Sequence, residues 1–335
     1  MRIRFGYWAP QEQYHPMQLL EHAVLAEKNG FDAIWTSDHF QPWVHTNAHC
    51  GFPWTFLAVA ADRTRQAAVG TGVTCPMFRY NPAIVAQAFA TLGSMYPNRV
   101  FLGLGSGEAV NEVPPGCSWP SLKERTERLE EAIKVVKLLW TKSFVSFRGK
   151  YYSLNKANLY TKPEKTIPLY VAANGPKVAR IAGRDCDGLI TVPFFEPQYL
   201  RDVLFNSTRE GAKSAGKDPS KLEFIVNYGL SYDEDYDKAL ASCRFWKGPI
   251  LPAVFKYAIS DPREIEEYAN LIGDDVLASK WFIATTPDEH IKNIERLIEL
   301  GFTQLAIQSS SPDEKKYIQI FGTKVLPYLK ERFKE

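Results

Sequence analysis

Cysteine, histidine and methionine are scarce in this chain of 335 residues, which contains five, six and four of them. The cysteines are odd in number and widely separated, so their spacing supports neither a disulfide framework nor a zinc site. We therefore expect reduced thiols with mostly structural roles and no bound metal. The cysteines are Cys50, Cys75, Cys117, Cys186 and Cys243.

An excess of one charge and long apolar runs are also absent. The formal net charge is only +2, from 40 basic and 38 acidic residues, so we expect no basic face for nucleic acid. No stretch approaches the ~20 apolar residues of a membrane-spanning helix, and residues 1–6 lead directly into a predicted strand rather than a signal peptide. These absences favour a cytoplasmic protein whose partner is neither a nucleic acid nor a membrane.

The chain instead shows a regular alternation of short apolar segments with longer amphipathic ones, which predicts eight strand–helix units. No linker or low-complexity tract divides it, so two separate α/β domains have no boundary to support them. The expected fold is therefore one (β/α)8 TIM barrel over residues 1–335, with insertions at about 142–165 and 232–280. The predicted strands span 2–8, 31–37, 68–74, 99–104, 168–173, 187–192, 221–231 and 303–308.

Polar residues gather where several predicted strands end, which is where such a barrel places its active site. Asp38 and His39 follow the second strand and lie between the aromatic residues Phe40 and Trp43, while Glu108 follows the fourth strand. The other candidates at strand ends are Cys75, Ser106, Gly107, Asn111, Asn174, Gly175, Pro176, Thr191 and Val192.

His39 and Glu108 are a plausible acid–base pair, because imidazole changes charge near neutral pH and both residues would face the same mouth. Two structural alternatives stay open, since His39 could be an ordinary loop histidine and Glu108 one of several surface glutamates. The turn Asn174–Gly175–Pro176 opens a helix whose free N–H groups could hold a phosphate, although most such turns only connect a strand to a helix.

Four longer segments, in order, resemble the coenzyme F420-dependent branch of the bacterial luciferase-like family. They are SDHFQPW at 37–43, FRYNPAIVAQ at 78–87, GSGEAVNE at 105–112 and ANGP at 173–176. The similarity extends to residues 309–311 and points to F420-dependent secondary alcohol dehydrogenases and F420-dependent glucose-6-phosphate dehydrogenases. It implies a luciferase-like barrel, usually a homodimer, that holds the deazaflavin coenzyme F420 in its mouth.

The resemblance also implies roles for individual residues. His39, Trp43 and Glu108 match the catalytic group of the family, and Asp38 matches a residue that contacts the ring system and hydroxyls of the cofactor. Gly72–Val73 matches a bulge with a cis peptide bond that presses against the deazaflavin ring. The remaining implied cofactor contacts are Ser106, Gly107, Asn111 and the phosphate-binding turn Ala173, Asn174, Gly175 and Pro176.

The substrate positions fall between the two kinds of relative. Where the sugar-phosphate enzymes hold phosphate with two lysines and an arginine, this chain has Phe195, Lys256 and Lys280, and so lacks the bidentate guanidinium that suits phosphate. Trp246 and Phe255 match the apolar pocket of the alcohol enzymes. We therefore favour hydride transfer from a small secondary alcohol to F420, with glucose 6-phosphate as the alternative.

Two further alternatives remain. An FMN-dependent monooxygenase of the same broad family is disfavoured by the combined motifs at 37–43 and 105–112, which resemble the F420 branch. A non-catalytic F420-binding protein is disfavoured because such a carrier needs neither His39 nor Glu108.

Overall fold

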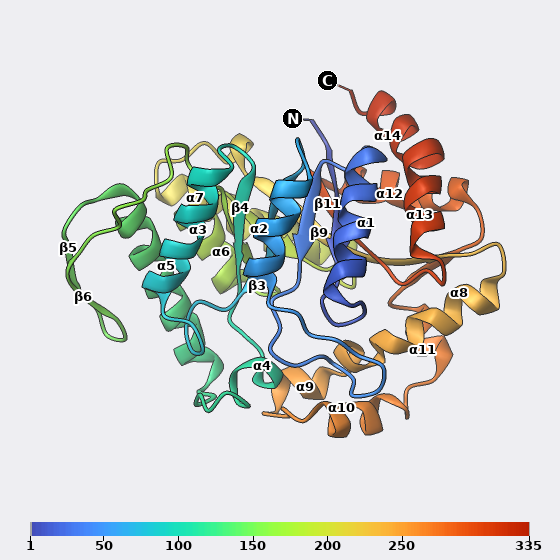
Figure 1. Ribbon diagram of the computed structural model, residues 1–335, viewed down its shortest axis with the longest axis horizontal. Helices are drawn as coiled ribbons and strands as arrows, with labels where there is room; N and C mark the ends of the chain where they lie inside the picture. Colours follow the sequence, from blue (N-terminus) through green and yellow to red (C-terminus); the bar gives the residue numbers. More distant parts are fainter. Residues whose placement is uncertain (1, 335) are drawn as a thin grey trace.

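Short segments rich in β-branched and aromatic residues form a closed parallel barrel in the computed structural model, which describes residues 2–334 (Figure 1). The long strand β9 pairs with β8 on one side and β11 on the other, and β11 pairs with β1, so the sheet closes on itself. The predicted (β/α)8 fold is confirmed. In order around the barrel the strands are β1 (Arg4–Ala9), β2 (Ala33–Thr36), β3 (Ala68–Thr74), β4 (Val100–Leu104), β7 (Leu169–Ala172), β8 (Gly188–Thr191), β9 (Glu223–Tyr232) and β11 (Gln304–Ser309).

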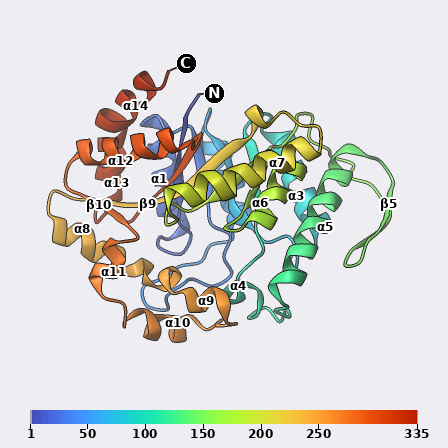
Figure 2. The same cartoon turned by 180° about the vertical axis from the view of Figure 1, so that it is seen from behind.

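Helices surround the barrel, and Figure 2 shows those on the opposite side from Figure 1. Proline lies at the start of many of them, where its missing N–H costs no helical hydrogen bond. The outer helices are α1 (Pro16–Lys28), α2 (Pro53–Arg63), α3 (Pro82–Met95), α5 (Leu122–Thr141), α6 (Pro176–Asp185), α7 (Asn206–Ser214), α12 (Pro287–Leu300), α13 (Glu314–Ile320) and α14 (Leu326–Arg332).

Two of the outer helical segments contain a π-helical turn. The segment that comprises α13 and α14 is divided by such a turn, Phe321–Val325, just before Pro327. Proline removes an N–H donor from the helical ladder, and a local change of hydrogen-bond spacing accommodates that loss. The helical segment after β8 likewise begins as a π-helix, Tyr199–Phe205, before it continues as α7.

Aromatic side chains fill the barrel below its mouth. Trp8 and Trp35 stack with ring centroids 6.4 Å apart, and Phe101 lies 4.2 Å from Trp35. Gly70 makes room for this packing, because a Cβ at that position would lie 2.3 Å from the Phe101 ring. The interior of the barrel at this level is therefore filled by side chains.

Most of the remaining elements lie within the two predicted insertions. Residues 142–165 contain the antiparallel hairpin β5 (Val145–Arg148) and β6 (Ser153–Ala157), which projects from one side of the molecule (Figure 1). The second insertion lies near α4 (Ala109–Glu112) at the lower edge of that view. Its elements are α8 (Tyr236–Ser242), a 3-10 segment (Cys243–Ile250), α9 (Pro252–Lys256), α10 (Pro262–Ala269) and α11 (Asp274–Ala278).

Two features outside the insertions were not predicted. The short strand β10 (Phe282–Ala284) extends the sheet at the end of β9, and a 3-10 turn (Pro219–Lys221) precedes β9.

Within residues 2–334, no helix combines the length and the apolar character needed to cross a membrane.

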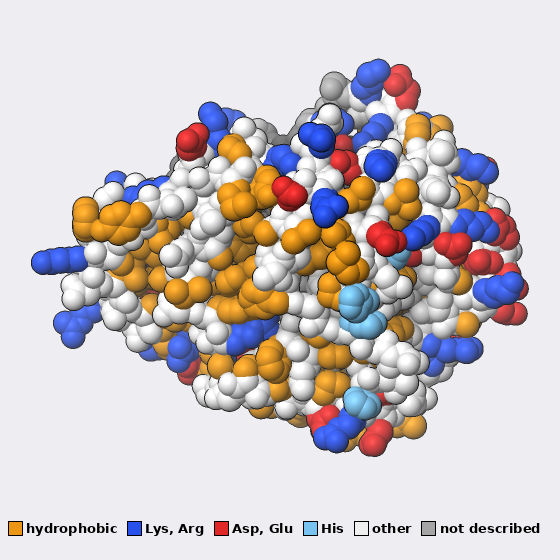
Figure 3. Space-filling view, in the orientation of Figure 1, with side chains coloured by type: hydrophobic (Ala, Val, Ile, Leu, Met, Phe, Trp, Pro, Cys, Tyr) orange, Lys and Arg blue, Asp and Glu red, His pale blue; other side chains and the backbone are white. Residues whose placement is uncertain are grey.

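Hydrophobic side chains gather on the face formed by α1, α2 and α3 (Figure 3). Met17 of α1, Val59 of α2, and Ile84 and Met95 of α3 are all exposed there. A contiguous apolar surface of this kind is uncommon on a protein that functions as a monomer.

Candidate active site

A cavity of about 800 Å³ opens at the carboxyl ends of the barrel strands. It brings together His39, Glu108 and every residue predicted to contact the cofactor, although these residues come from four different strand ends. The lining residues are Asp38, His39, Gly72, Val73, Cys75, Gly105, Ser106, Gly107, Glu108, Asn111, Glu112, Trp119, Leu122, Lys123, Arg125, Thr126, Ala172, Ala173, Asn174, Gly175, Pro176, Lys177, Val178 and Phe255.

A bulge in β3 forms part of this lining. The peptide bond between Gly72 and Val73 is cis, and the register of β3 against β4 shifts between Thr71 and Thr74. A Cβ at Gly105 would lie 2.4 Å from the Val73 side chain, so glycine is what allows β3 and β4 to approach here. The bulge that the resemblance implied is present and places an apolar side chain on the cavity wall.

His39 is held in one orientation by the backbone. Its Nδ1 lies 3.2 Å from the carbonyl oxygen of Gln41, which can only accept, so in the neutral ring Nδ1 carries the proton. Nε2 then has a free lone pair, and it lies 3.3 Å from Glu108 Oε2 and 3.4 Å from Glu12 Oε1. The ring packs against Trp43, with centroids 5.3 Å apart. Nε2 can accept a proton, and Glu12 would stabilise the resulting imidazolium.

The environment of Glu108 favours its protonated form. Desolvation by the surrounding protein raises the pKa of this carboxyl, the positive charge on protonated His39 opposes the shift, and Glu12 adds to it. The side chain is nevertheless 30% exposed, which keeps it accessible to a reactant in the cavity. Glu108 therefore has the properties of a proton donor.

Asn111 fixes Glu108 relative to His39. Its Nδ2 donates to Glu108 Oε2 at 3.0 Å, and its Oδ1 accepts from the backbone N–H of Phe40 at 2.9 Å. The short helix α4 thereby links the loop that carries His39 to the strand end that carries Glu108.

Asp38 lies in a buried network behind the cavity surface. Its Oδ1 accepts from Arg79 Nη2 at 2.5 Å and from the Tyr80 hydroxyl at 3.0 Å, while its Oδ2 accepts from Thr74 at 2.5 Å. Arg79 Nη2 also donates to the Asp38 carbonyl, and Glu112 lies 3.7 Å from Nη1. These bonds anchor the loop after β2, so Asp38 has a structural task in addition to the cofactor contact that the sequence predicts.

Glu12 is the site residue that sequence reasoning missed. It lies in the loop after β1, is only 1% exposed, and accepts a hydrogen bond from Ser37 Oγ at 2.7 Å. The strand-end rule applied to the first strand would have found it, but no motif in that loop drew attention to it. Trp119, Lys123, Arg125 and Lys177 were also missed, because they come from helix starts and the loop before α5 rather than from strand ends.

The predicted substrate residues divide into two groups. Phe255 lines the cavity, is 47% exposed, and its ring centroid lies 5.5 Å from that of Trp43. The other four do not line the cavity. Trp246 is buried and stacks on Trp281. Phe195 packs on Tyr199, Lys256 lies over the Tyr257 ring, and Lys280 lies over the Phe194 ring.

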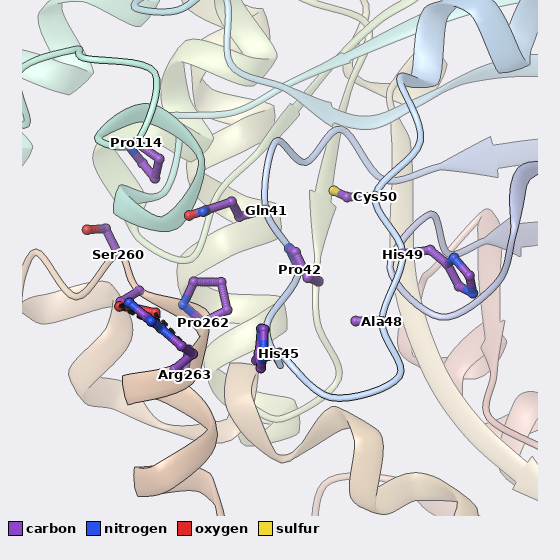
Figure 4. A pocket seen from close by; sticks show the side chains of 11 residues that line it. Gln41, Pro42, His45, Ala48, His49, Cys50, Pro114, Ser260, Pro262 and Arg263 are labelled. Carbon is purple, nitrogen blue, oxygen red and sulfur yellow. Dashed lines mark hydrogen bonds and ion pairs between the residues drawn. The ribbon is translucent and has the colours of Figure 1, made fainter.

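A second cavity of about 650 Å³ lies between the loop 41–50 and the start of α10 (Figure 4). Its charged residues Asp261 and Arg263 pair with each other at 2.6 Å, and none of the predicted site residues lines it. Residues 2–334 contain no group of histidine, cysteine or acidic residues that could hold a metal. The cavity at the strand ends is therefore the candidate active site.

Comparison with known proteins identifies the family. The model of the luciferase-like monooxygenase family matches residues 3–304. The chain belongs to the luciferase-like family. It is 40% identical over 333 residues to an F420-dependent glucose-6-phosphate dehydrogenase from Microbacterium testaceum, covering 99% of this chain and 98% of the relative.

Two solved structures resemble this chain. An F420-dependent secondary alcohol dehydrogenase in complex with an F420–acetone adduct is 46% identical, with a TM-score of 0.94 over 98% of this chain and 99% of that chain. The F420-dependent tetrahydromethanopterin reductase from Methanopyrus kandleri is 24% identical, with a TM-score of 0.79 over 98% of this chain and 99% of that chain, which shows a common fold alone. The family membership predicted from the four motifs is confirmed.

Proposed function

We propose that this protein is a coenzyme F420-dependent dehydrogenase that oxidises a small secondary alcohol. The observation that carries the proposal is that His39 and Glu108 face each other in a cavity lined by every residue predicted to contact F420. Both kinds of named relative, at 40% and 46% identity, are F420-dependent enzymes that act on a CH–OH group. This agreement disfavours an FMN monooxygenase, and the acid–base pair disfavours a carrier.

The walls of the cavity suit a deazaflavin in their chemistry. The bulge at Gly72–Val73 offers an apolar surface to a flat ring, and the turn before α6 offers backbone N–H groups to a phosphate. A Cβ at Gly175 would meet nothing within 4 Å, so space is open beside this turn. We infer that residues 173–176 hold the cofactor phosphate and that Val73 supports the ring.

Different residues of the chain would accept and donate the protons of the reaction. Bound F420 would supply the two-electron chemistry by accepting the hydride. His39 Nε2 takes the hydroxyl proton of the alcohol, because Nδ1–H is bound to Gln41 and Nε2 is the free base. Glu12 stabilises the imidazolium so formed, and Glu108 would hold the proton that the reduced coenzyme takes up. Trp43 orients the imidazole and excludes water.

The surroundings of His39 favour an apolar substrate. Trp43 and Phe255 form an aromatic wall beside it, and a sugar hydroxyl buried against such a wall would lose hydrogen bonds to water. Glucose 6-phosphate is the second candidate, since the Microbacterium testaceum relative at 40% identity is an F420-dependent glucose-6-phosphate dehydrogenase. Lys280 is the residue that favours this alternative.

Binding titrations with F420, FMN and NADPH test the cofactor assignment. We expect affinity for F420 alone, because the predicted cofactor contacts are those of the F420 branch and no strand-linked dinucleotide fingerprint is present. F420 reduction with isopropanol, other small alcohols, glucose and glucose 6-phosphate then tests the substrate. Tight NADPH binding without F420 affinity would overturn the proposal, and turnover of glucose 6-phosphate alone would select the second candidate.

Two substitutions separate the substrate classes. With a small alcohol, Phe255→Ala should raise KM, since the wall beside His39 is lost, while Lys280→Ala should change KM little. With a phosphorylated substrate, loss of a charge-assisted contact at Lys280 should raise KM by roughly tenfold to over a hundredfold. Steady-state kinetics of both variants distinguish the two cases, with Lys238→Ala on the distant helix α8 as a surface control. A large Lys280 effect confined to phosphorylated substrates contradicts the preference for alcohols.

We also propose a homodimer formed through the exposed apolar surface of α1, α2 and α3. This surface includes Met17, Val59, Ile84 and Met95, and a second copy of the chain would bury it. A monomeric mass by light scattering at micromolar concentration would contradict this.

A further inference from the structure

Arg125 is a nearly buried cation without a partner. It lies in the second turn of α5, is 8% exposed, and its guanidinium stacks over the Trp119 ring at 4.0 Å. Its Nε has no hydrogen-bond partner, and across residues 2–334 the guanidinium makes no hydrogen bond or ion pair with the protein. A buried charge normally requires both.

Arg79 shows what the protein provides when a buried arginine has a structural task. Its side chain is 6% exposed, and it pairs with Asp38 at 2.5 Å and Glu112 at 3.7 Å. Arg125 receives no such compensation, and burial lowers the pKa of its guanidinium. The fold therefore maintains an unfavourable charge at this position.

The position of Arg125 indicates what compensates it. Arg125 lines the candidate active site where the cavity continues from the strand ends to the starts of α5 and α6. Lys123 and Lys177 line the same part of the cavity and are both exposed. The acidic lining residues are committed elsewhere, since Asp38 and Glu112 contact Arg79 and Glu108 contacts His39. Three cations thus face the cavity without an acid to neutralise them.

We propose that Arg125 binds an anionic group of the bound coenzyme, a phosphate or a carboxylate, with Lys123 and Lys177 assisting at the rim. The proposal rests on the proposed F420 dependence and adds a side-chain receptor to the backbone turn at 173–176. Guanidinium suits the task, because its flat face packs on Trp119 while its N–H edge remains available for bidentate bonding.

Fluorescence titration of Arg125→Met and Arg125→Lys tests the receptor. One ligand is intact F420, and the other is the deazaflavin chromophore without its phosphate and tail. Arg125→Met should weaken F420 binding about tenfold to a hundredfold and leave chromophore affinity within about twofold, with partial recovery in Arg125→Lys. Arg128→Met is the matched control, since Arg128 lies on the same helix, pairs with Glu124 and does not line the cavity. Equal losses for both ligands would overturn the proposal.

Thermal unfolding of the ligand-free protein gives a readout independent of activity. Removing an unpaired buried charge should leave the Tm of Arg125→Met unchanged or raise it, whereas loss of a structural contact would lower it. A lower Tm together with unaltered F420 affinity would overturn the proposal, as would an effect limited to the KM of glucose 6-phosphate.

The two proposals can also fail separately. If the wild type does not bind F420, the proposed function fails, and inorganic phosphate then serves as the probe. If phosphate stabilises the wild type but not Arg125→Met, an anion receptor at this position is still supported. If phosphate does not stabilise the wild type, or stabilises both proteins equally, the receptor is overturned.

Discussion

The His39→Ala variant is expected to oxidise alcohol about 10²–10⁴ times more slowly than the wild type, the range usual for a general acid–base group. Its affinity for F420 should stay within a few-fold, because His39 acts on the substrate proton and the predicted cofactor contacts are otherwise intact. Measured kcat and a separate fluorescence titration check the two statements. His45→Ala is a suitable control, since His45 is an exposed histidine on the same loop. Near-normal turnover of the His39→Ala variant would return His39 to the structural role of an ordinary loop histidine.

Regular periodicity made most of the barrel predictable. Strand segments such as 68–74 and 99–104 are short and apolar and alternate with helices. Their order along the chain is also their order around the barrel. Because parallel strands all deliver their carboxyl ends to one mouth, the meeting of His39 and Glu108 followed from sequence once the fold was assigned.

The missed residues show where this reasoning ends. Glu12 follows β1, and it reaches His39 because β1 and β2 are neighbours in register, with Ala9 beside Thr36. The helix that contains Arg125 is rich in both charges and looks like an ordinary solvated surface. Several acidic residues lie near Arg125 in the sequence, so the sequence suggests ion pairs for it. Only the packed structure shows that Arg125 has no such partner.

The substrate residues were the hardest to place from sequence. Trp246, Lys256 and Lys280 lie in or beside the short helices of the 232–280 insertion, where no strand or helix period fixes the path of the chain. Trp246 is buried, but its Nε1 donates to Gln13 at 3.2 Å and it does not line the cavity. Matching positions between relatives therefore locates such residues only approximately.

Glu108→Gln is expected to lower kcat by about 10²–10⁴, because glutamine keeps the shape of the side chain but has no acidic proton to give. Its amide oxygen can still accept from Asn111 Nδ2, so the loop and His39 should remain in place. Glu108→Asp, which restores the acid on a shorter side chain, should recover part of the rate. If both variants bind F420 as tightly as the wild type, the loss of kcat lies in the chemical step.

The raised pKa of Glu108 determines how activity and thermal stability should change with pH. As a proton donor Glu108 must be protonated, so wild-type activity should fall as pH rises through its raised pKa, and the Gln variant should lack this basic limb. A carboxyl with a raised pKa in the folded state stabilises the fold at low pH and loses that contribution as pH rises. Glu108→Gln should therefore gain more in Tm relative to wild type at pH 8 than at pH 4. An unchanged basic limb in the Gln variant would show that another group donates the proton.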